Sequence, residues 1–328
     1  MTYRMPAEWA EQDWIWIGFP AAADLWEDDL VPAQEQVAAF ANAIAATGQE
    51  VRLVVRDNVA LQQARALVQP QVVIEQHPYG DIWLRDTGPL TLLDKDGRRA
   101  ARRFGFNGWG GKYMLDGDQH TGHSLVEAGG LADLGRADWV LEGGAVDTDG
   151  TGLVVTTEQC LLNRNRNPSL SQADIAERLG RDLGLTRVLW LGDGLLGDHT
   201  DGHVDNLARF VAPGRIAIPV AADSDDPNAA TYDEAAARAE AFGLDVVRVP
   251  SPGLIGDSED AEPASYMNFV IANRVVVVPV YGSRFDDEAV AAIGALFPGR
   301  TAVGLMADAV LTGGGSFHCC SQHVPMAL

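Results

Sequence analysis

The chain has 328 residues, of which 47% are hydrophobic and 21% charged, and its formal net charge is −22. This balance is typical of a soluble globular protein that can bury a sizeable core. The acidic charge argues against nucleic-acid binding, which needs clustered Lys and Arg, and it favours cationic ligands. No apolar run approaches the roughly 20 residues that span a bilayer, so we expect no membrane association.

The first 20 residues contain no basic region followed by a long apolar stretch, so we expect no signal peptide. Cysteine occurs only at Cys160, Cys319 and Cys320, which is too few for a disulfide framework. Thiols stay free in a reducing compartment. These observations predict a cytoplasmic protein.

Helices and short β-branched strands alternate along the chain. Apolar spacing and alanine content predict helices at Ala33–Thr47, Val59–Val68, Ser124–Leu131, Ser169–Leu183, Tyr232–Phe242 and Asp287–Leu296. Strands are predicted at Val51–Val55, Val72–Glu75, Trp139–Leu141, Val188–Leu191, Val246–Val249 and Thr301–Leu305. This alternation predicts the α/β class.

A second regularity is a unit that occurs five times along the chain. In each unit a helix is followed by a short strand and then by a stretch rich in polar residues or glycine. The polar residues that end these five stretches are Asp86, Glu142, His203 with Asp205, Asn268 and Cys319. Repeats of about this length are typical of circular or solenoid arrays, and five of them predict a closed ring in which these side chains converge on the axis. The alternative is that polar residues were matched to a period by chance. No linker-like segment divides the chain, so we expect one domain over residues 1–328.

The segment Asp198–Asn206 offers two kinds of site. His203 and Asp205 are two residues apart, so on a strand both would face the same side. His199, His203 and Asp205 also resemble a His-x3-His-x-Asp metal-ligand set, although Gly202 disfavours the helix that would align the histidines. A capped turn with solvated side chains is the third alternative.

Trp83 lies three residues before Asp86 in "WLRDTGP". An aromatic wall beside a carboxylate suits a planar cation, because the ring face attracts a guanidinium and the carboxylate accepts its N–H groups. The alternative is a local ion pair between Arg85 and Asp86 at a turn.

The C-terminal segment "GGGSFHCCSQHVP" combines a glycine run with two adjacent thiols. Gly313–Gly315 permit a close approach of the backbone to a ligand. A thiol with an ordinary pKa of about 8.5 needs a nearby cation or base to act as a nucleophile, and His203 or a cationic substrate would serve. Neighbours on a strand face opposite sides, so Cys319 and Cys320 are not expected to line the same site. A buried, unreactive cysteine is the alternative.

The chain resembles the agmatine deiminase family, also called the bacterial (Porphyromonas-type) peptidylarginine deiminase family. The resemblance rests on motifs that occur in order over nearly the whole chain: "MPAEW", "WLRDTGP", "FNGWGGKY", "EGG", "TTEQCLLNRNRNP", "TDGHVDN", "ASYMNF" and the C-terminal segment. The family belongs to the guanidine-modifying superfamily, and the resemblance implies a five-bladed α/β propeller with its active site on the central axis.

The resemblance also implies the roles of individual residues. It makes Cys319 the nucleophile, His203 the general acid and base, and Asp86 and Asp205 the carboxylates that grip the guanidinium. It places Trp83, Glu142 and Asn268 in the substrate pocket and Cys320 in the core. The implied reaction converts agmatine to N-carbamoylputrescine and ammonia through a covalent thiouronium intermediate, without metal or organic cofactor. A peptidylarginine or other guanidine deiminase is the alternative within the family, and a metal-dependent hydrolase using His199, His203 and Asp205 is a more remote one.

Two segments depart from the family pattern and leave the substrate open. The chain ends Ser321-Gln322-His323-Val324-Pro325, and "FPAAADLWEDDL" lacks the Trp-Pro and Trp-Arg signatures of agmatine-specific members. We expect Glu27 and Asp28 in this second segment to attract the distal amine of a small cationic substrate. The alternative is that they favour the N-terminus of the following helix. A homo-oligomer is compatible with the sequence.

Overall fold

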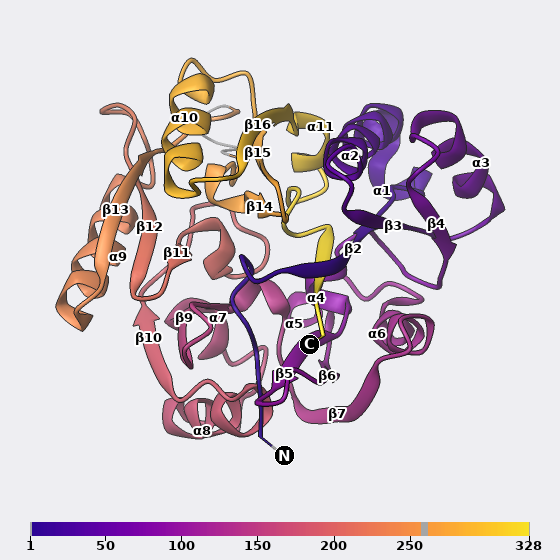
Figure 1. Ribbon diagram of the computed structural model, residues 1–328. Coiled ribbons are helices and arrows are strands. Elements are labelled where there is room, and N and C mark those ends of the chain that lie inside the picture. The colour runs from indigo at the N-terminus through magenta and orange to yellow at the C-terminus, as the bar shows by residue number, and fades with distance from the viewer. Residues whose placement is uncertain (1, 257–261, 328) are drawn as a thin grey trace.

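The computed structural model describes residues 2–256 and 262–327 and has a mixed α/β architecture (Figure 1). The helices are α1 (Ala23–Trp26), α2 (Leu30–Ala45), α3 (Asn58–Leu67), α4 (Leu84–Thr87), α5 (Gly108–Gly111), α6 (Asp118–Ala128), α7 (Glu158–Leu161), α8 (Gln172–Leu183), α9 (Ala229–Phe242), α10 (Asp286–Leu296) and α11 (Asp308–Leu311). Short 3-10 turns are η1 (Glu27–Asp29), η2 (Gly143–Ala145), η3 (Val204–Asn206) and η4 (Tyr266–Asn268).

The strands are β1 (Tyr3–Arg4), β2 (Gln12–Gly18), β3 (Glu50–Val55), β4 (Val73–Gln76), β5 (Leu90–Asp94), β6 (Arg99–Gly105), β7 (Ala132–Val140), β8 (Asp147–Thr148), β9 (Leu153–Thr157), β10 (Arg187–Leu191), β11 (Arg209–Ala212), β12 (Arg215–Val220), β13 (Asp245–Pro250), β14 (Val270–Ile271), β15 (Val275–Val280), β16 (Thr301–Met306) and β17 (Ser321–Pro325). Within the described ranges they form five small sheets.

All five sheets share one pairing pattern. An antiparallel pair is followed, through a helix, by a strand parallel to the second member of the pair. This order holds for β5-β6-β7 across α6, β8-β9-β10 across α8, β11-β12-β13 across α9 and β14-β15-β16 across α10. In the fifth sheet β17 pairs antiparallel with β2, which is parallel to β3 across α2. The C-terminal strand therefore completes the sheet that begins near the N-terminus.

Local sequence explains where the helices begin and end. Helix α8 has a capping box, in which Ser171 and Asp174 satisfy each other's backbone N–H groups, and it ends at Gly184 in the left-handed conformation. Its apolar face buries Ile175, Leu179 and Leu183. The α/β class and the six predicted helices are confirmed, although α6 begins six residues before the predicted Ser124 and ends at Ala128.

The predicted strands are present, but they were only part of each sheet. The prediction Trp139–Leu141 falls at the end of β7, which begins at Ala132. Most of the first two strands of each sheet, such as β12 and β15, were not predicted. Their central residues are buried without alternation, so they lack the period-two pattern that marks a half-exposed strand.

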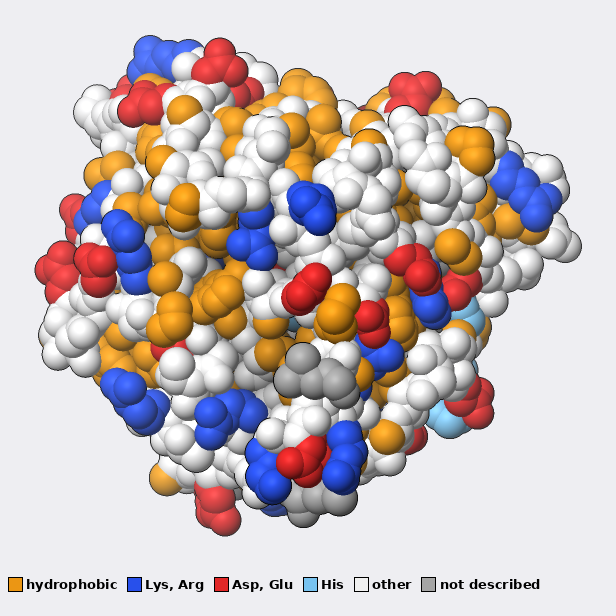
Figure 2. Space-filling model, in the orientation of Figure 1, with side chains coloured by type: hydrophobic (Ala, Val, Ile, Leu, Met, Phe, Trp, Pro, Cys, Tyr) orange, Lys and Arg blue, Asp and Glu red, His pale blue; other side chains and the backbone are white. Residues whose placement is uncertain are grey.

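On the face shown in Figure 2, Lys and Arg side chains lie scattered among acidic, apolar and other side chains. Of the helices that the structure describes, none has the length and apolar character needed to cross a membrane.

Candidate active site

A cavity of about 180 Å³ brings together segments from both ends of the chain. Its lining residues are Leu25, Trp26, Asp81, Trp83, Asp86, Trp109, Tyr113, Leu115, His199, Thr200, Thr312, Gly313, Gly314 and Cys319. The volume is smaller than the roughly 300–1,000 Å³ of sites for drug-sized ligands, so the cavity suits a small molecule. The lining includes Cys319 and Asp86, two of the residues implied by the family resemblance.

Cys319 lies in the turn that precedes β17, so the expectation that both thiols lie on a strand is wrong. The turn nevertheless separates them. Cys319 lines the cavity, whereas Cys320 is fully buried, with its thiol 3.4 Å from the carbonyl oxygen of Phe317. The Sγ of Cys319 lies 3.1 Å from Asn268 Nδ2 and 3.9 Å from Asp205 Oδ2. One thiol therefore faces the cavity and the other packs in the core.

The glycines before Cys319 are required by close contacts. A Cβ atom on Gly315 would lie 2.7 Å from the Trp83 ring and 3.2 Å from Cys319 Sγ, and one on Gly313 would lie 2.5 Å from the Trp26 ring. The two indoles stack with their centroids 6.0 Å apart. Only a chain without side chains at these positions can pass between the aromatic wall and the thiol.

Asp86 is fixed in the first turn of α4 by two donors. Its Oδ1 accepts a hydrogen bond from the backbone N–H of Gly144 at 2.9 Å, and its Oδ2 accepts one from Trp109 Nε1 at 2.9 Å. Burial raises the pKa of Asp86, the positive charge of His203 opposes this rise, and the charges of Asp205 and Glu142 add to it. Arg85 does not form the local ion pair that was the alternative, because it reaches back to within 3.6 Å of Glu8.

His203 lies directly before η3, and Asp205 lies within it, so this segment is a turn and not a strand, but both side chains are buried and not solvated. The Nδ1 of His203 lies 3.7 Å from Asp86 Oδ2. A Cβ atom on Gly144 would come within 2.5 Å of this nitrogen, so the glycine of "EGG" lets the backbone approach both groups. Burial alone would lower the pKa of His203, but the charge of Asp86, the hydrogen bond and charge of Cys160 and the charge of Glu142 together hold this pKa well above its ordinary value.

Asp205 is held by a chain of buried charged groups. Its Oδ2 lies 2.7 Å from His318 Nδ1, and His318 Nε2 lies 2.8 Å from Glu8 Oε2. Burial alone would raise the pKa of Asp205, but the hydrogen bond and charge of His318 lower it below its ordinary value. Asp205 is therefore an anion beside the thiol of Cys319.

The electrostatics of the cavity favour a cation. Burial raises the pKa of the Cys319 thiol well above its ordinary value, and the charges of Asp205 and Asp86 raise it further. The same two carboxylates attract a positive ligand, which would stabilise the thiolate as it enters. Without such a ligand, Cys319 is a thiol at neutral pH.

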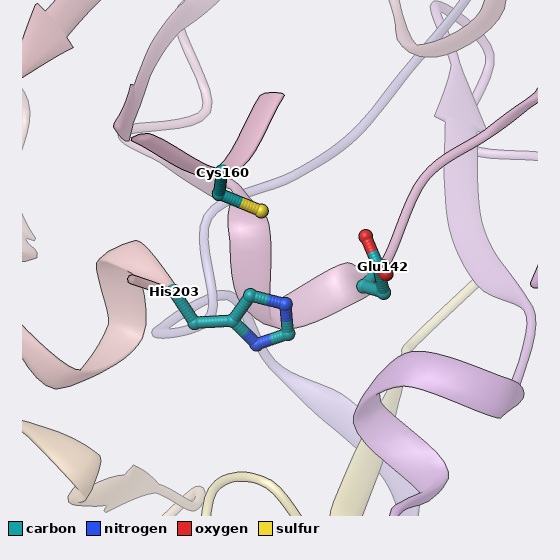
Figure 3. Close-up of side chains that lie close together, drawn as sticks. All are labelled: Glu142, Cys160 and His203. Atoms are coloured by element: carbon teal, nitrogen blue, oxygen red, sulfur yellow. The ribbon is translucent and has the colours of Figure 1, made fainter. Parts of the chain in front are cut away.

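Glu142 and Asn268 support this arrangement from behind. Glu142 is fully buried, and its Oε1 accepts a 2.7 Å hydrogen bond from Arg166 Nε. Figure 3 shows Glu142 near His203 and Cys160. Asn268 Oδ1 accepts hydrogen bonds from the backbone N–H groups of His318 and Cys319 and so fixes the turn that carries the thiol.

The structure does not assemble the predicted metal set. In the described part of the chain, the group of potential ligands within 4.8 Å of one another is Glu142, Cys160 and His203. It includes neither His199 nor Asp205. His199 lines the outer part of the cavity, where its ring stacks on Tyr113 at 6.1 Å.

Glu27 and Asp28 lie on the exposed turn η1 and do not belong to the lining of the cavity. Their role towards a distal amine remains a prediction. The helix-start alternative fits their position, because η1 leads directly into α2.

Sequence reasoning missed four residues that shape the site: Trp109, His318, Glu8 and Asp81. The first three lie inside the quoted motifs "FNGWGGKY", "GGGSFHCC" and "MPAEW". The signal was therefore present, but their partners lie far away in sequence and appear only in the fold.

Cys319 and Asp86 line one cavity, and the buried Asp205 and His203 lie 3.9 Å from Cys319 Sγ and 3.7 Å from Asp86, respectively. A cysteine, a histidine and two aspartates are the groups that nucleophilic thiol chemistry uses, and here they lie in a mixed α/β fold of small sheets. The chain belongs to the Porphyromonas-type peptidyl-arginine deiminase family, whose model matches residues 4–325.

Individual relatives match over almost their full length. The chain is 35% identical to the agmatine deiminase of Stutzerimonas stutzeri, with 98% of this chain and 95% of the relative covered. The solved agmatine deiminase of Enterococcus faecalis superposes with a TM-score of 0.93 at 33% identity, covering 99% of this chain and 96% of the other. A Cys-to-Ser variant of the C. jejuni agmatine deiminase with substrate bound gives a TM-score of 0.90 at 26% identity, covering 100% and 97%.

The raised thiol pKa makes a prediction about alkylation of Cys319. Below its pKa a thiol is protonated and unreactive, so iodoacetamide should modify Cys319 slowly at pH 7 and faster only above the ordinary thiol value of about 8.5. Asp86→Asn removes a negative charge, so it should lower the thiol pKa and increase the rate near pH 8. Mass spectrometry of the Cys319 peptide across pH measures both profiles, with the buried Cys320 as an internal reference. A profile that is unchanged in the variant would contradict this electrostatic account.

Proposed function

We propose that this protein is a hydrolase of linear amidines that converts agmatine to N-carbamoylputrescine and ammonia. The observation that carries the proposal is the placement of Cys319 Sγ 3.9 Å from Asp205, in a cavity that Asp86 also lines. A thiol and a carboxylate that line one small cavity, with a second carboxylate directly beside the thiol, match a guanidinium, which is planar, always charged and able to donate paired hydrogen bonds. The curated and solved relatives named as agmatine deiminases support agmatine as the substrate.

The first half of the reaction replaces a nitrogen by sulfur. Asp86 and Asp205 hold the guanidinium so that its carbon faces Cys319, and the positive charge lowers the thiol pKa, so that Cys319 releases its proton to solvent. The thiolate attacks the carbon, and the electron pair of the C–N π bond moves to nitrogen. His203, whose raised pKa keeps it protonated, donates a proton to that nitrogen. Ammonia leaves, and a thiouronium adduct remains on Cys319.

The second half restores the enzyme. His203 is now neutral and takes a proton from water, which attacks the adduct carbon. The C–S bond breaks, its electron pair returns to Cys319, and the ureido product leaves. In sum the guanidinium and one water give a urea and ammonium, so the reaction consumes no other reactant.

We also propose that the five sheets are the blades of a pseudo-symmetric propeller that forms one domain over residues 1–328. The shared pairing pattern of the sheets and the pairing of β17 with β2 support this arrangement. The cysteines in the described structure are all free, which supports a cytoplasmic location. A homo-oligomer remains a prediction.

The test of the function is ammonia release from agmatine, free arginine, a peptidyl-arginine and related guanidines. We expect agmatine to give the highest kcat/KM, because a carboxylate of free arginine would meet the negative charge of the cavity. Activity should survive chelators and be lost on alkylation of Cys319. A higher kcat/KM for peptidyl-arginine would contradict agmatine as the substrate and would make the protein a peptidylarginine deiminase. Loss of activity to chelators together with resistance to alkylation would favour a metal-dependent hydrolase.

The two adjacent thiols give a matched pair of variants. Cys319→Ser should lose nearly all turnover, because a serine hydroxyl has no base placed to ionise it and the covalent route closes. Cys320→Ser should retain measurable turnover, since its thiol packs against Phe317 outside the cavity. Steady-state kinetics and circular dichroism of both variants make the comparison. Equal loss of activity in two folded variants would contradict the assignment of the nucleophile.

A further inference from the structure

The imidazole of His203 has a second set of neighbours, which help to raise its pKa but form and break no bond in the proposed reaction. In Figure 3 its Nε2 edge faces the thiol of Cys160 and the carboxylate of Glu142, while Nδ1 lies 3.7 Å from Asp86. Ligand atoms of Cys160, His203 and Glu142 all lie within 4.8 Å of one another, and the three side chains are fully buried. This set is called the rear cluster below.

The rear cluster contains buried polar atoms without partners. Nε2 of His203 and Oε2 of Glu142 lie at hydrogen-bonding geometry to no partner within the described structure, and Cys160 is the donor or acceptor that lies beside Nε2. Buried polar atoms are nearly always paired, so two unpaired ones that face the same cluster point to an occupant. The other oxygen of Glu142 is fixed by Arg166, which leaves Oε2 oriented but free.

We propose that Cys160, His203 and Glu142 form a binding site for Zn²⁺ or a similar soft divalent cation, and that its occupancy inhibits the enzyme. Thiolate, imidazole and carboxylate are the ligand types of zinc, whereas Mg²⁺ and Ca²⁺ prefer oxygen alone. The side chains would move about an ångström inwards to reach bond lengths of roughly 2.0–2.3 Å. Binding releases the thiol proton of Cys160 to solvent and keeps His203 neutral. The buried carboxylates Asp86 and Asp205 make the surroundings favourable for a cation.

The kinetic form of the inhibition follows from the geometry, and this part rests on the proposed function. A metal on Nε2 prevents His203 from forming the imidazolium, the acidic form that protonates the leaving nitrogen, so kcat should fall. Asp86 and Asp205 remain free to bind the guanidinium, so KM should change little. A cation bound instead to Cys319 would occupy the cavity and raise KM.

The activity test compares Zn²⁺ inhibition of the wild type with that of two cysteine variants. We expect Zn²⁺ to lower kcat of the wild type and of Cys320→Ser equally, and a chelator to reverse the effect. Cys160→Ser and Cys160→Ala should each require at least about tenfold more Zn²⁺, relative to their own metal-free activity, because a ligand is lost. Equal sensitivity of the Cys160 variants, or inhibition through KM, would overturn the proposal.

A second readout does not need turnover. Co²⁺ bound by a thiolate gives a charge-transfer absorption, and the Cys319→Ser variant should show it because Cys160 supplies the sulfur. The double variant Cys319→Ser with Cys160→Ser should lose it, although Cys320 is still present. Absence of the band in Cys319→Ser would overturn the site. If the wild type deiminates no guanidine, the proposed function fails, while the Co²⁺ measurement still decides whether the metal site exists.

A separate observation concerns Asp81, which lines the cavity but is not among the groups assigned to the guanidinium. Its Oδ1 accepts a 2.9 Å hydrogen bond from Trp26 Nε1. Burial raises its pKa to about 6, although hydrogen bonds from Trp26, Trp83 and the backbone of Ile82 oppose this rise, and the charge of Arg56 has a smaller effect. A cation in the cavity would therefore stabilise the charged form of the Asp81 carboxylate.

We infer that Asp81 is a specificity-determining residue that meets the distal ammonium group of the substrate while it holds Trp26 in place. This inference rests on the proposed function. Agmatine carries two positive charges, and the lining contains two carboxylates, Asp81 and Asp86. With Asp86 assigned to the guanidinium, Asp81 is the buried acid that remains for the amine. Exposed Glu27 and Asp28 would compete for this role only from outside the cavity.

The test distinguishes the effect of the charge of Asp81 on the substrate from its effect on the position of Trp26. Asp81→Asn keeps an oxygen that can accept from Trp26 but removes the charge, so kcat/KM for agmatine should fall at least about tenfold. For butylguanidine, which has no amine, the value should stay within about twofold of the wild type. Equal losses on both substrates would show a positioning role and overturn the inference. Glu27→Gln with Asp28→Asn is the matched control: a selective loss of agmatine turnover there, with none in Asp81→Asn, would assign the amine to the exposed turn instead.

Discussion

The carboxylate of Glu8 is the interaction on which the geometry of the site depends. Its Oε2 lies 2.9 Å from Arg209 and 2.8 Å from His318, and Arg85 is 3.6 Å away. Burial alone would raise the pKa of Glu8, but the charges of Arg209 and His318 hold it well below its ordinary value. Breaking such a buried set by removing one partner typically costs about 3–5 kcal/mol, because the remaining charges lose their compensation.

The consequences reach the cavity through His318, which contacts Glu8 with one ring nitrogen and Asp205 with the other. The position of Asp205 beside Cys319 is thus set by a residue near the N-terminus. The C-terminal segment Ser321–Pro325, which departs from the family pattern, contacts the same buried charged groups. Gln322 lies 3.3 Å from the Arg85 guanidinium, and burial lowers the pKa of His323 to about 3, so His323 adds no charge.

The cavity combines anionic carboxylates with a protonated thiol, and this combination has a functional meaning. A preformed thiolate between Asp86 and Asp205 would be repelled by both, so the free protein keeps sulfur neutral. A cationic ligand reverses that balance at the moment it binds. Close backbone contacts make the arrangement rigid, since Gly144 and Gly315 leave no room for a Cβ atom beside His203 and Trp83. Reactivity is therefore tied to occupancy by a cation.

The amino-acid sequence by itself determined the α/β class, the six long helices and the motifs that carry Cys319, His203, Asp86 and Asp205. These features follow from apolar spacing, caps and residue type, which act over a few positions. It did not reveal the inner strands, because segments such as Val275–Val280 are buried on all sides and show no alternation. It also misjudged local backbone: Cys319 and Asp205 lie in turns, not strands. The partners that set charge and orientation, among them Glu8, Trp109 and His318, were decided only by the tertiary structure. Pairings such as His318 with Glu8 join residues 310 positions apart, and a distance between side chains that far apart exists only once the sheets have packed.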